Sequence, residues 1–110
     1  MDTKSAGKKL LQNTEKTIRG TLLGSSSRII KATPVVSGRL MGNWQPSLNT
    51  PTTGTTTKTT SGLSEVAATL SRIKLGDIFY LSNNLPYAYP VELRTGMVRI
   101  EVARLKSAIL

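Results

Sequence analysis

The sequence predicts an α+β domain, in which a small antiparallel sheet packs against a long N-terminal helix, a second helix and a C-terminal helix. Three observations predict this class: a helical apolar stripe over residues 8–32, strand-like segments over residues 39–45 and 77–83, and a threonine-rich tract between the two strands. We expect residues 1–110 to form one domain, because the chain is long enough for one modest core but not for two.

Residues 8–32 form the first predicted helix. Its apolar side chains recur at helical spacing, at Leu10, Leu11, Ile18, Leu22, Leu23, Ile29 and Ile30. Gly24 and the three serines after it weaken the middle, because glycine costs about 1 kcal/mol relative to alanine and serine favours helix ends. The segment is therefore either one long helix or two helices, the second capped by a serine. Residues 1–9 are lysine-rich and have no apolar face, so we expect a flexible, frayed N-terminus.

A break and the first predicted strand follow in residues 33–45. Pro34 cannot continue a helix, and Gly38 allows the chain to turn. From there Leu40, Gly42 and Trp44 alternate with a second set of side chains, as in a strand with two unlike faces. The core should close around the only tryptophan in the chain. We expect three core anchors: Leu40, Trp44 and Phe79.

Threonine dominates the segment after this strand. Eight of the eleven residues from Thr50 to Thr60 are threonine, and none carries a large apolar side chain that could join a core. We expect residues 48–62 to project as a long loop or hairpin arm. A disordered surface loop is the favoured interpretation for the free protein, and an extended ribbon turning at Gly54 is the alternative. The functional interpretation is an arm that becomes ordered against neighbouring subunits.

The second half of the chain predicts a helix, a strand and a further helix. Ser64 can cap the second helix, whose predicted apolar face consists of Val66, Ala67, Leu70 and Ile73. Lys74 and Gly76 suit its C-terminal end. Residues 77–83 form the second predicted strand, followed by a short irregular or helical connection over residues 87–93.

The last segment fits two patterns. Val98, Ile100 and Val102 alternate as in a strand, whereas Val98, Val102, Leu105 and Ile109 follow a helical stripe. Helix-favouring residues near the end favour a C-terminal helix.

The composition is strongly basic. The chain has 15 Lys and Arg residues against 6 Asp and Glu, and a formal net charge of +9. Residues 1–40 hold eight of the basic residues and two of the acidic ones. Such an excess favours contact with a polyanion or an acidic protein, although a basic domain without such a partner has the same composition.

The sequence offers no chemistry typical of an enzyme. It lacks histidine and cysteine, so the commonest general base, metal ligand and thiol nucleophile are all missing. The six acidic residues are scattered singly, and no phosphate-binding loop is present. We therefore predict no catalytic, cofactor or metal site. We also expect no membrane span or secretory signal, and the lack of cysteine fits a reducing cytoplasm.

Three segments, in order, resemble one protein family. Residues 33–45 read Thr-Pro-Val-Val-Ser-Gly-Arg-Leu-Met-Gly-Asn-Trp-Gln, residues 78–89 contain Asn-Leu-Pro-Tyr-Ala, and residues 96–99 read Gly-Met-Val-Arg. They are similar to patterns in the small neck and tail-completion proteins (head–tail joining, minor tail) of tailed bacteriophages. Val36 departs from that pattern, where aspartate is usual, and Met41 stands where arginine is common.

The resemblance implies a structural virion protein without enzymatic activity. Proteins of this family form rings, hexamers or dodecamers, that complete or terminate the tail and join it to the head connector around the DNA channel. The implied partners are copies of itself, the neighbouring neck, connector and tail-tube proteins, and genomic DNA in non-specific contact. The implied location is the virion neck, assembled in the bacterial host cytoplasm. The alternative is a stand-alone basic nucleic-acid-binding protein, and a minor enzyme of tail assembly is a third candidate.

Two sets of residues are the predicted contacts. The subunit-interface set consists of Arg39, Asn43, Gln45, Thr52, Thr53, Thr55, Thr56, Thr57, Tyr87 and Tyr89. Arg39 either pairs with a neighbour's carboxylate or covers Trp44 with its aliphatic stem. The set facing the DNA channel or an acidic partner consists of Lys8, Lys9, Lys16, Arg19 and Lys58.

Overall fold

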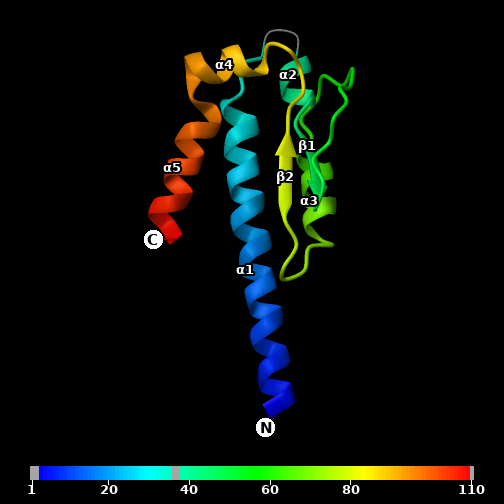
Figure 1. The fold of residues 1–110 in the computed structure, drawn as a ribbon, viewed down its shortest axis with the longest axis vertical. Helices are drawn as coiled ribbons and strands as arrows, with labels where there is room; N and C mark the ends of the chain where they lie inside the picture. The colour runs from blue at the N-terminus through cyan, green and yellow to red at the C-terminus, as the bar shows by residue number, and fades with distance from the viewer. Residues whose placement is uncertain (1–2, 36–37, 110) are drawn as a thin grey trace.

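Helix α1 (Thr3–Ala32) runs along the centre of the molecule, and the other elements flank its C-terminal half (Figure 1). The computed structural model describes residues 3–35 and 38–109. On one side of α1 lies α5 (Met97–Ile109), and on the other lie the sheet and α3 (Leu63–Leu70). The domain is α+β, as predicted, and the N-terminal half of α1 extends beyond the rest (Figure 1).

Helix α1 is continuous through its serine-rich middle, which excludes the two-helix alternative. Ser25 and Ser26 are buried there, at 5% and 2% exposure. Their small side chains suit a helix that packs on both α3 and α5, so tertiary packing outweighs their low helix propensity. The backbone of residues 3–9, where we expected fraying, is helical and continues α1. Of the predicted apolar stripe, Ile29 and Ile30 are buried, whereas Leu23 is exposed.

The predicted strand over residues 39–45 is wrong in its first part. Residues Arg39–Gly42 form a single helical turn, α2, and strand β1 begins only at Gln45 and ends at Leu48. Gly38, with a φ of 83°, starts the turn, and its carbonyl accepts the Gly42 N–H. Leu40 and Trp44 are four residues apart, a separation that fits one side of a helical turn as well as one face of a strand. Val36 lies outside the described residues.

The sheet has two antiparallel strands, β1 and β2 (Phe79–Ser82), with Gln45 opposite Ser82 and Leu48 opposite Phe79. Strand β2 falls inside the predicted segment. Asn49, with a φ of 67°, extends the pairing, because its N–H bonds the Ile78 carbonyl and its side-chain oxygen accepts the Ile78 N–H.

Helix α3 starts one residue earlier than predicted. Ser64 lies inside the helix, so its predicted capping role is wrong, and the Leu63 N–H donates to the Ser61 hydroxyl at 3.3 Å. The predicted apolar face is confirmed at Val66 and Leu70, which are buried. The predicted end at Lys74 and Gly76 is wrong, because α3 ends at Leu70 and the buried Ile73 lies after it. Ala67 is exposed, because it lies one residue beyond the stripe that meets α1.

The connection over residues 87–93 is helical: α4 (Ala88–Thr95) lies across the C-terminal end of α1 (Figure 1). The C-terminal helix is confirmed as α5. Gly96, with a φ of 68°, joins the two helices. The Glu92 carboxylate accepts the N–H groups of Val98 and Arg99 at 2.8 and 3.0 Å, which caps the start of α5.

The core gathers side chains from α1, α2, α3, α5 and the connecting segments. It consists of Ile29, Ile30, Leu40, Trp44, Val66, Leu70, Ile73, Leu85 and Met97. The predicted anchors Leu40 and Trp44 belong to it, and Phe79 is partly buried against it. The Trp44 indole N–H donates to the Thr33 hydroxyl, which donates to the Ile29 carbonyl; both distances are 2.8 Å.

Candidate interaction surfaces

The Thr-rich loop, residues 49–62, contains neither helix nor strand and lies against the domain. Its main anchor is Asn43, whose side chain is fully buried. The amide nitrogen of Asn43 donates to the carbonyls of Arg39 and Thr56 at 2.7 and 2.8 Å. Its amide oxygen accepts the Thr56 N–H at 2.8 Å. Asn43 therefore pairs with both backbone groups of one loop residue, as a strand neighbour would.

Two further amides hold the first part of the loop. Gln45 donates to the Gly54 carbonyl at 2.8 Å, and Asn84 donates to the carbonyls of Thr52 and Gly54 at 2.9 and 3.0 Å. All three anchors bond backbone groups of the loop, so the loop's path depends little on its threonine side chains.

The second part of the loop passes directly over two glycines. A Cβ atom at Gly42 would collide with the Lys58 carbonyl, and one at Gly38 would collide with the Thr59 carbonyl. This close approach requires glycine at both positions, since the opposing atoms belong to the backbone.

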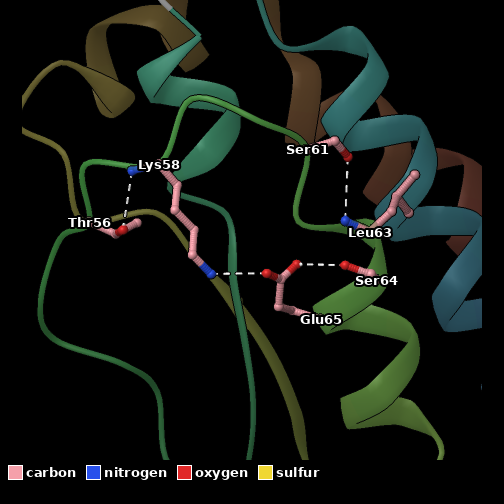
Figure 2. Close-up of polar contacts among 6 residues, drawn as sticks. All are labelled: Thr56, Lys58, Ser61, Leu63, Ser64 and Glu65. Atoms are coloured by element: carbon pink, nitrogen blue, oxygen red, sulfur yellow. Dashed lines mark hydrogen bonds and ion pairs between the residues drawn. The ribbon is translucent and has the colours of Figure 1, made fainter.

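An ion pair joins the loop to α3 (Figure 2). The Lys58 ammonium lies 2.9 Å from the Glu65 carboxylate, whose other oxygen accepts the Ser64 hydroxyl at 3.1 Å. The Lys58 N–H also donates to the Thr56 hydroxyl at 3.2 Å. The hydrogen bond from Lys58 is the main reason that the pKa of the Glu65 carboxyl lies below its usual value.

The predicted interface residues differ in exposure. Arg39 and the side chains of Thr53, Thr55 and Thr57 are exposed, and those of Gln45, Thr52 and Thr56 are partly buried. Asn43 has no exposed surface, so its side chain serves the fold of a single chain instead of a contact with a neighbour.

A second exposed surface lies on α4 and α5. The predicted residues Tyr87 and Tyr89 are exposed, at 41% and 70%, and so are Leu93 and Ile100, at 58% each. Sequence analysis did not single out the last two. The helical register of α4 and α5 was needed to place them outside the core.

The predicted basic residues do not share one face. Lys16 is exposed and Arg19 partly buried on α1, whereas Lys58 lies in the loop and pairs with Glu65 on α3. The side chains of Lys8 and Lys9 lie outside the described residues.

Sequence analysis missed a charged cluster between α1 and α5. Glu101 on α5 is 3% exposed, and its carboxylate lies 2.8 Å from both Nε and Nη2 of Arg28 on α1. Arg104 Nε lies 3.6 Å from the second oxygen. Arg28 and Glu101 are 73 residues apart, so no local sequence pattern could predict this pair.

The three segments that carry the family resemblance meet at one end of the domain. Trp44 bonds Thr33 within the first segment, and the Asn83 amide of the second donates to the Leu40 carbonyl of the first at 2.8 Å. Met97 of the third segment is buried in the same core as Trp44.

Within the described ranges, no three His, Cys, Asp or Glu side chains are grouped in a way that could hold a metal ion. No described helix is long and apolar enough to cross a membrane. No family model matches the sequence, and the searches of curated proteins and of solved structures found no significant match.

Proposed function

We propose that this chain is a structural subunit of a tailed-bacteriophage neck, which assembles into a ring that completes the tail and joins it to the head connector. The observation that carries the proposal is the meeting of the three family-like segments. The Asn83 amide of the second segment donates to the Leu40 carbonyl of the first, 43 residues away in the sequence, and Met97 of the third shares their core. A common place in the fold is what a family relationship of the three segments would produce.

The exposed surfaces support assembly. The sheet formed by the described residues has only two strands, so each strand has an outer edge that no strand covers. Such edges favour pairing with other chains. The apolar side chains of Tyr89, Leu93 and Ile100 add contact area of the kind found in subunit interfaces.

The loop is anchored to the domain, so the role that we propose for it differs from that of a free arm. Its backbone is anchored by Asn43, Gln45 and Asn84, so it presents exposed Thr53, Thr55 and Thr57 from a defined position. A preorganised loop loses less conformational entropy on binding than a disordered one. We propose that these threonines contact the neighbouring subunit.

The excess of basic residues suits a ring around DNA. Exposed lysines such as Lys16 can contact phosphates without reading the base sequence. A channel through which DNA slides requires contacts of this sequence-independent kind. The stand-alone nucleic-acid-binding protein remains the second candidate, because the same net charge of +9 favours it.

Two measurements test the proposal: native mass spectrometry of the purified protein, and an assay of head–tail joining. We expect a closed oligomer of one fixed subunit number, and weak duplex binding by the monomer. Replacing Thr53, Thr55 and Thr57 by glutamate should block joining of purified heads to tails, because three charges at a subunit contact repel and lose hydration. The matched control places three glutamates at Ala68, Ser71 and Leu75, which are exposed, uncharged and outside the loop, so the net charge changes equally.

One outcome would reject the neck assignment: a monomer that binds DNA with submicromolar affinity and a steep salt dependence, which is the behaviour of the second candidate. Full joining activity of the loop variant would remove the loop from the mechanism and leave the neck assignment in place.

A further inference from the structure

A charged groove lies between α1 and α5. Figure 1 shows these two helices side by side. Two adjoining hollows, of about 370 and 490 Å³, lie along the groove and share Arg28 and Arg104. The first also contacts Lys31, Met97 and Ile100. The second is lined mainly by small residues of α1, namely Thr17, Gly20, Thr21 and Gly24.

The buried carboxylate of Glu101 holds the arginines in place. Both of its oxygens face a guanidinium, at 2.8 Å from Arg28 and 3.6 Å from Arg104. The two arginine side chains nevertheless remain 45% and 60% exposed. Each guanidinium has five N–H donors, and the single carboxylate accepts only some of them.

The groove therefore carries a net positive charge, although it contains a carboxylate. Arg28, Arg104 and the exposed Lys31 carry three positive charges against the one negative charge of Glu101. Gathering three cations costs repulsion that one anion only partly offsets, so a second anion would be attracted. Because Glu101 orients Arg28 in advance, less side-chain entropy is lost on binding.

We propose that this groove binds an acidic peptide segment of a partner protein. Its carboxylates would bond Arg28 and Arg104, and an aliphatic side chain would rest on Ile100. Thr17 to Ala32 spans about 22 Å of helix, which matches an extended peptide of about seven residues. The site belongs to a single chain, so it does not require the ring.

The shape of the groove favours a peptide over duplex DNA. Hollows of 370 and 490 Å³ between two helices admit side chains, whereas a duplex is about 20 Å wide and needs cations spread along its phosphates. The apolar lining by Met97 and Ile100 has no counterpart on a phosphate backbone.

A second copy of this chain is a poor occupant. Its projecting helix, residues 3–13, carries three basic residues and no acidic residue, so its charge repels the groove. The occupant we infer is a different, acidic chain.

The test is fluorescence anisotropy of the full chain with a labelled peptide of aspartate, glutamate and leucine, about seven residues long. Its controls are the same peptide with asparagine and glutamine, and a duplex of roughly 20 base pairs. At about 0.15 M salt we expect saturable binding of the acidic peptide in the micromolar range, and no such binding of the two control probes.

Three variants locate the site. Arg104→Gln should weaken peptide binding about tenfold and Lys31→Gln about threefold, since they remove groove charges but leave the Arg28–Glu101 pair intact. Arg72→Gln removes the same charge beyond α3, on the other side of α1, and should change binding less than about twofold. Circular dichroism confirms that each variant is folded.

Three results would overturn the proposal. Equal weakening by all three substitutions would mean that net charge alone attracts the peptide. Duplex binding that depends on Arg104 and Lys31, without peptide binding, would assign the groove to nucleic acid. No binding of either probe at about 1 mM protein would leave Glu101 as an ion-pair link between α1 and α5 only.

Discussion

At the residue scale, a few buried polar side chains hold segments together that are distant in sequence. Asn43, Thr33 and Glu101 are 0%, 3% and 3% exposed, and each bonds a different element. A buried polar group costs free energy unless it is paired, so each of these partners is required for the fold. Ser25 differs, because its buried hydroxyl has no hydrogen-bond partner among the described residues.

Thr33→Val should lower the free energy of unfolding by about 2 kcal/mol. The substitution keeps the shape but leaves the Trp44 indole N–H buried without its acceptor. Urea unfolding followed by the fluorescence of the single tryptophan measures the change. The control is Thr95→Val, which removes a similar bond to the carbonyl four residues earlier and only a long 3.4 Å acceptor contact with the Met97 N–H. It should cost less than about 1 kcal/mol. Equal losses would show that the indole bond contributes nothing.

Two carboxyl groups should make the fold sensitive to acid. The Lys58 hydrogen bond lowers the pKa of Glu65, and the Lys74 N–H and the Asn49 amide lower the pKa of Asp77. Because both folded-state pKa values are depressed, the stabilisation is present above the unfolded-state values and is lost as pH falls through the folded values, below about pH 4. Glu65 is exposed and Asp77 is only partly buried, so solvent screens both groups and the effect is small.

Carboxyl NMR titration of two variants separates the causes. Lys58→Gln should raise the pKa of Glu65 toward its usual value, because the donor is a side chain. Lys74→Gln should leave the pKa of Asp77 nearly unchanged, because Lys74 donates its backbone N–H. A large rise of the Asp77 pKa would contradict this assignment.

At the element scale, the Thr-rich loop is anchored to the domain beside the sheet, although it forms no strand. The Asn43 side chain bonds both backbone groups of Thr56, as a neighbouring strand would. Gly42 has no side chain, which leaves room for the loop backbone to pass. The loop contains one basic residue, Lys58, which makes it a natural trypsin probe.

Asn43→Ala should speed tryptic cleavage after Lys58 by about tenfold, because losing two loop bonds favours local opening by about 1.4 kcal/mol. The rate is measured by mass spectrometry of the digest under native conditions. Thr53→Ala, an exposed change in the same loop, should leave it unaltered. An unchanged rate in Asn43→Ala would mean that the other anchors suffice.

At the scale of the whole molecule, the helix that organises the fold also extends away from it. Core contacts of α1 among the described side chains come from Ile18, Leu22, Ile29 and Ile30. The N-terminal half of α1 lies outside the packed body (Figure 1). The core contacts described for α1 therefore begin at Ile18, and under the proposed function the projecting part is a contact surface.

Deleting residues 1–13 should shift the thermal unfolding midpoint by less than about 3 °C, because the core residues remain. Under the proposed function, the same deletion should reduce ring formation, because the projecting helix is lost as a contact surface. Differential scanning calorimetry and native mass spectrometry measure the two effects. A drop in the midpoint of about 10 °C would place the deleted segment in the fold itself.

The spacing of apolar residues, a local property of the chain, was enough to predict the class of fold, the helical N-terminal segment and the place of Trp44 in the core. Helix-favouring residues then favoured a C-terminal helix over a strand. Tertiary contacts were needed to establish that α1 is one helix, that residues 39–42 turn as a helix, that Asn43 anchors the loop, and that Arg28 meets Glu101. A separation of four residues fits both a strand and a helical turn, and partners 13 or 73 residues apart leave no mark in a local pattern. They become neighbours only when the core brings α1, α2 and α5 together.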